Sequence, residues 1–201
     1  MDETETRRPA VFWDRDGTLI EDRGHLADPG EAVLFPDTIG ALRRLRDRFL
    51  FFIVTNQSGV AEGTISLADA ERVNAHVVGQ LAAAGVEIAA VYVCPHRRAD
   101  ACTCIKPNPH FLHRAAEQFR VSLAHSFVVG DHPHDVELAE RAGARGVYLC
   151  TGHGRKHLGE LRGHEVVVPD IRAAADWIVS AVEAEERDQC GCGGKRPETA
   201  R

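Results

Sequence analysis

Three apolar residues, Val11 to Trp13, run directly into the sequence Asp-Arg-Asp-Gly-Thr, and this junction constrains the fold more than any other stretch. The apolar run predicts a short buried strand, and Gly17 predicts a turn at its end. In an extended chain Asp14 and Asp16 project on the same side. Two neighbouring buried carboxylates repel each other unless a divalent cation lies between them, and Mg²⁺ favours oxygen ligands. A surface turn is the alternative, because Asp-Gly is a common turn pair.

Apolar runs alternate with amphipathic segments along the chain. Strands are expected at 10–13, 49–54, 86–93, 126–129, 146–150 and 165–168, and helices at 37–48, 66–85, 109–119, 136–142 and 170–184. This alternation predicts an α/β fold, a Rossmann-like parallel sheet flanked by helices. We expect residues 1–8 to be disordered, 9–184 to form one domain, and 185–201 to be a flexible tail.

The composition limits the classes of partner. The chain has 201 residues, 44% of them hydrophobic, and a net charge of −6. Such a chain can bury a sizeable core, and its negative charge disfavours nucleic-acid binding. No apolar run approaches the roughly 20 residues of a membrane span, and the charged N-terminus lacks the apolar core of a signal peptide. We therefore expect a cytoplasmic monomer with a small-molecule partner and neither nucleic acid nor membrane as partners.

Polar residues follow several of the expected strands. Thr55 follows the second strand and Asp131 the fourth, so both should meet Asp14 and Asp16 at one sheet edge, where open parallel sheets bind ligands. The Thr55 hydroxyl and the loop amides after it suit a phosphoryl oxygen, although a strand-end cap is the alternative.

Two further residues have open roles. Lys106 precedes two prolines that would stiffen its setting, so it could act as a charge clamp rather than face solvent. Asp135 could contact a residue that binds the cation, or it could cap the next helix.

A second motif lies in the irregular segment 94–109. Cys94 and His96 form one pair with a single residue between them, and Cys102 and Cys104 form another. Two such pairs can converge on one tetrahedral ion, and a Cys₃His set is a usual structural zinc site. The alternatives are free cysteines or a Cys102–Cys104 disulfide.

The order Asp14-x-Asp-Gly-Thr, Thr55, Lys106, then Gly130-Asp131 with Asp135 resembles the haloacid dehalogenase (HAD) superfamily of phosphatases over about residues 9–161. Within it, the chain is most similar to the D-glycero-D-manno-heptose 1,7-bisphosphate 7-phosphatases and next to the histidinol-phosphate phosphatases. The segments that suggest the heptose branch are 22–25 (Asp-Arg-Gly-His) and 55–63 (Thr-Asn-Gln-Ser-Gly-Val-Ala-Glu-Gly).

The resemblance implies an HAD-like fold without a large cap domain, and a role for each matched residue. Asp14 would attack phosphorus, and Asp16 would protonate the leaving oxygen and then activate water. Catalytic Mg²⁺ would be held by Asp14, Asp131 and the backbone carbonyl of Asp16. The relatives carry a structural zinc loop at the position of Cys94 to Cys104. The residues implied in substrate binding are Asp22, Arg23, Gly24, His25, Thr55, Asn56, Gln57, Ser58 and Lys106.

The chain departs from the family pattern at three places. Ile105 stands where the family usually has Arg, His132 where it often has Lys or Arg, and Arg23-Gly24-His25 where the heptose enzymes tend toward His-Gly-Tyr. These departures leave the substrate open, with histidinol-phosphate phosphatase as the next candidate, and they leave room for a non-catalytic zinc-stabilised binding protein. Nucleic-acid end repair is a further candidate because it shares similar motifs, but the negative charge of the chain argues against it.

Other histidines and cysteines are interpreted conservatively. His132, His134, His153 and His157 are taken as polar loop residues, because short-spaced pairs are expected by chance among 11 histidines. Cys190 and Cys192 are interpreted as solvated thiols of the tail, with a redox or metal role as the alternative.

Overall fold

A six-stranded parallel sheet forms the centre of the molecule. The computed structural model describes residues 7–190, and the strand order is β3-β2-β1-β4-β5-β6. The strands are β1 (Ala10–Trp13), β2 (Leu50–Asn56), β3 (Ala90–Cys94), β4 (Phe127–Gly130), β5 (Arg145–Leu149) and β6 (Val166–Val168). Every residue of β1 is buried, as expected for a strand paired on both sides and covered on both faces. The expected parallel sheet is confirmed.

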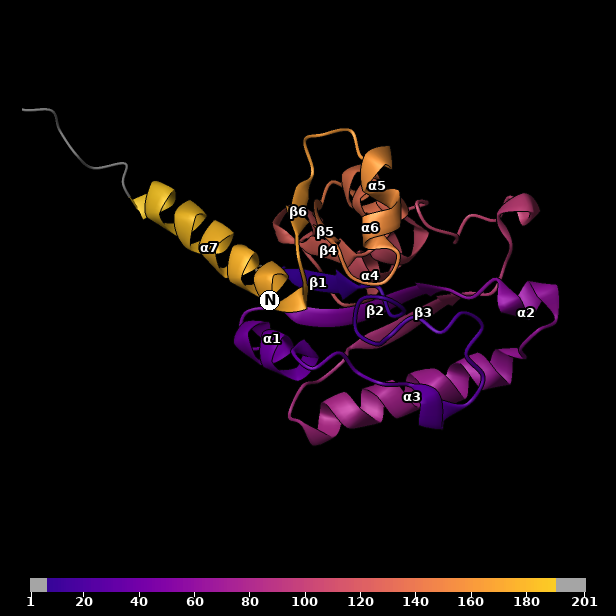
Figure 1. Cartoon of the computed structure of the whole chain (residues 1–201). Helices are drawn as coiled ribbons and strands as arrows, with labels where there is room; N and C mark the ends of the chain where they lie inside the picture. The colour runs from indigo at the N-terminus through magenta and orange to yellow at the C-terminus, as the bar shows by residue number, and fades with distance from the viewer. Residues whose placement is uncertain (1–6, 191–201) are drawn as a thin grey trace, which may run out of the picture.

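Helices cover both faces of this sheet (Figure 1). They are α1 (Thr38–Leu45), α2 (Gly59–Glu62), α3 (Leu67–Ala83), α4 (His110–Gln118), α5 (Pro133–Ala142), α6 (Gly154–His157) and α7 (Ile171–Cys190). The helix α3 begins at the predicted capping box, in which the Ser66 hydroxyl accepts from the Asp69 amide. None of the helices within residues 7–190 combines the length and the apolar character of a membrane span.

Alternate residues of the strands feed two separate cores. Val11 and Trp13 pack with α1, α3 and α7 on one face, whereas Ala10 and Phe12 pack with α4 and α5 on the other. The same period holds in β2, where Phe51 and Phe52 enter opposite cores. Hydrophobic packing thus covers both faces of the sheet, and the loops at the carboxyl ends of the strands start from a well-packed core.

Several predicted boundaries were wrong, among them the end of β2, which includes Thr55 and Asn56. The strand β3 starts at Ala90 rather than at Val86, because the Val86 amide donates to the Leu81 carbonyl and completes the end of α3. Arg8, predicted to be disordered, is tied into the fold by backbone hydrogen bonds with Arg120 and Ser122. Here the backbone partners of residues distant in the chain override the local pattern.

The last helix, α7, extends beyond the predicted end at residue 184 and reaches Cys190. Glu185 forms an ion pair with Arg145 at 2.6 Å, and Glu186 approaches Arg48 at 3.5 Å. The polar sequence that predicted a tail therefore continues the helix and docks on the body. Predictions for residues 1–6 and for the tail from 191, Cys192 included, lie outside the described residues.

Candidate active site

The chain turns sharply after β1 and places both motif acids over one end of the sheet. The Asp14 amide still donates to the Val129 carbonyl at 2.9 Å, but a bend follows at Arg15, whose carbonyl accepts from the amides of Leu19 and Ile20. The expectation that an extended chain aligns the two carboxylates was wrong, because the loop and not the strand carries Asp16. Both side chains nevertheless line the same cavity.

Gly17 allows this loop to pass close to a third carboxylate. Its φ is +78°, a conformation that favours glycine, and a Cβ there would lie 2.2 Å from the Asp131 Oδ2 atom. The Gly17 carbonyl also accepts from the Thr151 hydroxyl at 2.6 Å. The glycine of the motif is thus required by the position of Asp131.

A buried ammonium joins two of the carboxylates. The Lys106 Nζ atom donates to Asp14 Oδ1 at 2.6 Å and to Asp135 Oδ1 at 2.7 Å, and all three residues are buried. Burial acts to lower the pKa of Lys106, but the charges of Asp135 and Asp14 outweigh it and raise that pKa, which keeps the ammonium charged. Asp135 also accepts from the His132 amide, so it fills both roles that the sequence left open.

The carboxylates outnumber this single cation. Asp14, Asp131 and Asp135 each offer an oxygen, and these oxygens lie within 4.8 Å of one another. Burial raises the pKa of Asp131 to about 8, and the neighbouring charges of Asp14 and Asp135 add to the rise. Burial likewise raises the pKa of Asp14 to about 6, against the opposing effect of Lys106. A cluster of oxygen donors short of positive charge fits a divalent cation.

The four zinc candidates converge as their spacing predicted. Three sulfur–sulfur separations are 3.3, 3.5 and 3.6 Å, and His96 Nδ1 lies 3.4 Å from Cys104 Sγ and 3.7 Å from Cys94 Sγ. A tetrahedral ion with Zn–S bonds of about 2.3 Å would place the sulfurs about 3.8 Å apart. Cys102 and Cys104 are free thiols in this structure, so a disulfide between them is not formed. The set could hold a metal ion.

The loop between β3 and α4 carries both this cluster and Lys106. The Lys106 amide donates to the Asn56 side chain at 3.2 Å, and the Asn108 side chain donates to the Cys102 carbonyl at 3.0 Å. The first bond ties the loop to the end of β2, and the second closes the loop on itself. The position of the buried ammonium therefore depends on the fold of the cysteine loop.

A cavity of about 340 Å³ opens over this edge of the sheet. The sequence-predicted residues that line it are Asp14, Asp16, Asp22, Thr55, Asn56, Lys106 and Asp131. Gln57 lies just behind them, buried, and its Nε2 atom donates to Asp16 Oδ2 and Thr55 Oγ1, both at 2.8 Å. The structure thus brings together residues that are more than 100 positions apart in the chain.

Besides Gln57, four other predicted substrate-binding residues lie outside this cavity. Arg23 pairs with Glu21 at the surface, the His25 ring contacts the Thr64 hydroxyl at 2.7 Å, and Ser58 begins α2 without using its side chain as a cap. Gly24 lines a neighbouring cavity of about 500 Å³, which shares Asp22 and His153 with the first. Their contact with substrate stays a prediction.

Four lining residues were missed or dismissed from the sequence: Arg98, His132, His134 and His153. His132 and His134 stack at 4.3 Å between ring centres, and the His153 ring pairs with Asp22 at 2.7 Å. Burial, together with His134 and His157, lowers the pKa of His132 to about 4, so this imidazole is neutral near pH 7. The signal that could have found His132 and His153 is the one used for Asp131, since both lie in the segments that follow β4 and β5. The prediction that His134 and His157 are loop residues was wrong, because they lie in α5 and α6.

The sheet edge therefore combines a buried carboxylate, a second acid in the same cavity, and an ammonium and a hydroxyl that could contact the oxygens of a phosphate. That set defines a hydrolase of phosphate esters. The comparisons with known proteins agree. Residues 103–174 match the HAD-hydrolase-like family. The D-glycero-β-D-manno-heptose-1,7-bisphosphate 7-phosphatase of Escherichia coli K12 is 31% identical over 182 residues, which cover 87% of this chain and 90% of the relative.

Two solved structures extend the likeness to the fold. The D,D-heptose 1,7-bisphosphate phosphatase of B. bronchiseptica, complexed with magnesium and phosphate, has a TM-score of 0.79 at 30% identity and covers 86% of this chain and 99% of its own. The D,D-heptose 1,7-bisphosphate phosphatase of Burkholderia thailandensis has a TM-score of 0.66 at 28% identity, with coverage of 86% and 99%. The chain belongs to the HAD superfamily of phosphatases and is a phosphoric monoester hydrolase.

Proposed function

We propose that this chain is a Mg²⁺-dependent phosphatase that removes the 7-phosphate of D-glycero-D-manno-heptose 1,7-bisphosphate through an aspartyl-phosphate on Asp14. The observation that carries the proposal is the buried Asp14 carboxylate, bonded to Lys106 within a cluster of three carboxylates. The names of the similar proteins supply the substrate. The proposal includes a cytoplasmic monomer.

In the first step an Asp14 oxygen bonds to phosphorus while the bond from phosphorus to the sugar oxygen breaks. Asp16 gives its proton to that oxygen, so the sugar leaves as an alcohol. Burial raises the pKa of Asp16, although the charge of Arg15 acts to lower it. The raised pKa favours the protonated acid needed here. Lys106 and the Thr55 hydroxyl neutralise the oxygens of the transferred phosphoryl group.

In the second step water attacks phosphorus, Asp16 takes a proton from it, and the bond to Asp14 breaks to release phosphate. The residues that would hold Mg²⁺ are Asp14, Asp131 and the backbone carbonyl of Asp16, and the position of Asp135 adds a fourth candidate. When bound, the ion neutralises the repulsion between the carboxylate nucleophile and the phosphate anion.

The cysteine loop adds two features to the proposal. Zinc bound by Cys94, His96, Cys102 and Cys104 would fix the loop and so place Lys106. The short helix at Arg98–Asp100 puts Arg98 on the cavity wall, where no carboxylate of residues 7–190 forms an ion pair with it. Arg98 would therefore receive the second phosphate of the substrate.

A screen of phosphate esters tests the proposal. Purified protein with Mg²⁺ is assayed for phosphate release from heptose 1,7-bisphosphate, histidinol phosphate and p-nitrophenyl phosphate. We expect the highest kcat/KM for the heptose bisphosphate. Absence of Mg²⁺-dependent release from all three contradicts the enzyme, and a preference for histidinol phosphate contradicts only the substrate.

A further inference from the structure

Arg15, the residue between the two motif acids, is fully buried although it carries a charge. Two nitrogens of its guanidinium contact the Asp16 carboxylate. Nε lies 3.2 and 3.1 Å from the two carboxylate oxygens, and the nearest separation between NH2 and a carboxylate oxygen is 2.8 Å. Forked contacts of this kind fix the orientation of a carboxylate as well as its position.

The third nitrogen of this guanidinium is anchored to a distant helix. NH1 donates to the Asn74 Oδ1 atom at 2.7 Å, and Asn74 lies buried on α3. Burying a guanidinium is unfavourable unless well-placed partners replace its contacts with water. The catalytic loop is thus connected through Arg15 to the layer of helices below the sheet.

Two side chains of the segment at the end of β2 contact the same carboxylate. Asp16 Oδ2 accepts from Gln57 Nε2 at 2.8 Å and lies 3.4 Å from the Thr55 hydroxyl. The side chain of Asp16 keeps 16% of its surface exposed, and it lines the cavity. Arg15 and Gln57, which are both buried and do not line the cavity, therefore hold a carboxylate that does line it.

We propose that Arg15, anchored by Asn74, is a positioning residue that orients Asp16 for proton transfer to the leaving oxygen. This inference rests on the proposed function, in which Asp16 is the acid. Arg15 acts only through Asp16, because the guanidinium is sealed from the cavity. Its removal should therefore damage the proton transfer and spare the attack by Asp14.

Two leaving groups separate this role from a purely structural one. An alkyl phosphate needs a proton on its leaving oxygen, whereas the p-nitrophenolate of p-nitrophenyl phosphate leaves readily without one. The parameter kcat/KM reports the steps up to the first release of product, so later hydrolysis of the aspartyl-phosphate does not enter it. The alkyl substrate is heptose 1,7-bisphosphate or, if that is inactive, the best alkyl ester of the screen.

For Arg15→Gln we expect kcat/KM to fall roughly 100-fold on the alkyl phosphate and less than about 5-fold on p-nitrophenyl phosphate. Arg15→Lys keeps the charge without the fork and should recover part of the loss. Asn74→Ala keeps the guanidinium but frees it, and should give the same pattern at smaller size; it also serves as the test if Arg15→Gln does not fold. The control is Arg72→Gln, an exposed arginine on the same helix that pairs with Asp69.

Equal losses on both substrates in a folded Arg15 or Asn74 variant would overturn the positioning role and leave the proposed function intact. A wild-type protein with no Mg²⁺-dependent turnover of either substrate would overturn both.

Discussion

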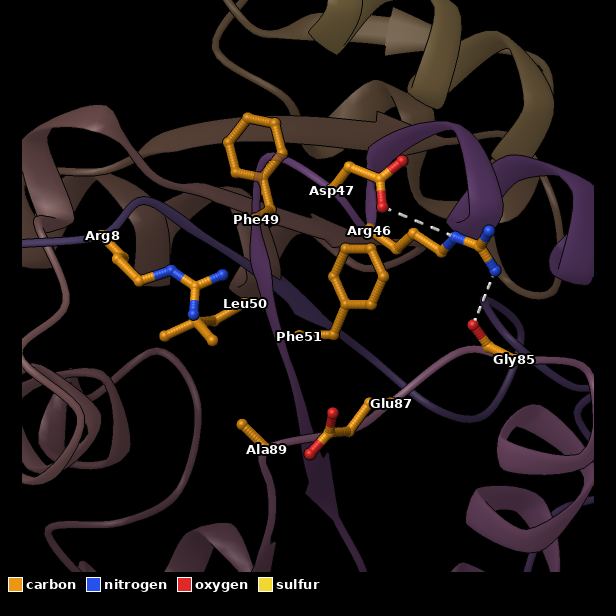
Figure 2. A pocket seen from close by; sticks show the side chains of 9 residues that line it. All are labelled: Arg8, Arg46, Asp47, Phe49, Leu50, Phe51, Gly85, Glu87 and Ala89. Carbon is orange, nitrogen blue, oxygen red and sulfur yellow. Dashed lines mark hydrogen bonds and ion pairs between the residues drawn. The ribbon is translucent and has the colours of Figure 1, made fainter.

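The two ends of the sheet each carry a cavity of similar size, about 340 Å³ at the carboxyl ends of the strands and about 390 Å³ at their starts. The second is lined by Arg8, Leu50 and Ala89, which begin or precede strands, with Phe49 and Phe51 as its buried floor (Figure 2). Volume alone does not distinguish the two.

Their charges do. At the strand starts two basic and two acidic side chains, all at the exposed rim, balance one another, and Arg46 is satisfied by Asp47 at 3.8 Å and by the Gly85 carbonyl at 2.9 Å (Figure 2). At the carboxyl ends, three carboxylates are buried around one ammonium. Buried, unbalanced charge therefore marks the cavity at the carboxyl ends of the strands, here called the active end, as the functional one. Such an arrangement lowers stability unless a ligand neutralises it.

The largest expected effect comes from comparing the loss of one acidic side chain at each end of the sheet. Asp14→Asn should reduce kcat by roughly 10³-fold or more, since the amide cannot form the aspartyl-phosphate. Asp47→Asn at the opposite cavity should stay within about twofold of wild type, because that carboxylate is exposed and its one ion pair among residues 7–190 is with Arg46. Phosphate release measures both. Comparable turnover of Asp14→Asn and wild type would show that Asp14 is not the nucleophile.

The next effect tests whether the cysteine loop belongs to the active end. Cys104→Ser should lower bound zinc and reduce kcat/KM roughly 10- to 100-fold, because Lys106 lies two residues further along the same loop. Metal content by mass spectrometry and phosphate release are measured together. The matched control is Cys150→Ser, a free cysteine outside the cluster. Full zinc content in the Cys104 variant would contradict the assigned ligand set.

The buried acids predict how pH acts on the active end. Their pKa values, about 6 for Asp14 and about 8 for Asp131, lie above the ordinary 3.8, so the folded, metal-free state holds these protons more tightly than the unfolded state. Their contribution to stability is therefore complete below pH 3.8 and is lost as pH rises through about 6 and 8.

Mg²⁺ competes with the same protons, so the rise in Tm on adding Mg²⁺ should be larger at about pH 8.5 than at about pH 5.5. Differential scanning fluorimetry measures this difference. Asp47→Asn should leave the difference unchanged, and Asp131→Asn should reduce it. An Mg²⁺ effect that is independent of pH would show that these carboxyl groups do not bind the ion.

The smallest effect compares two arginines. Arg98→Ala should raise KM for the bisphosphate roughly 5- to 10-fold, with little change for p-nitrophenyl phosphate, which has no second phosphate to bind. Arg8→Ala removes an exposed arginine from the opposite cavity and should change neither value. Steady-state kinetics on both substrates are compared. A similar rise in KM for both substrates would remove Arg98 from recognition of the second phosphate.

Site residues that directly follow a strand were predictable, because parallel strands deliver their carboxyl ends to one edge. Asp14 and Asp131 are of this kind, and Thr55, which lies within the last residues of β2, reaches the same edge. Arg98 was not predictable, since its place on the cavity wall depends on how the cysteine loop folds back over the sheet. The double role of Asp135 was equally hidden, because it requires an ammonium from a residue 29 positions earlier in the chain.

By itself the sequence determined the parallel sheet, the order of the motifs and the convergence of the cysteine pairs. Each depends on periodicity or short spacing, which local backbone geometry enforces. Only the tertiary structure decided that Asn74 anchors Arg15 behind the motif, that Lys106 lies between two acids, and that α7 continues past its predicted end. These features arise where segments distant in sequence pack together, and desolvation there changes the energy of a charge more than any neighbour in the chain does.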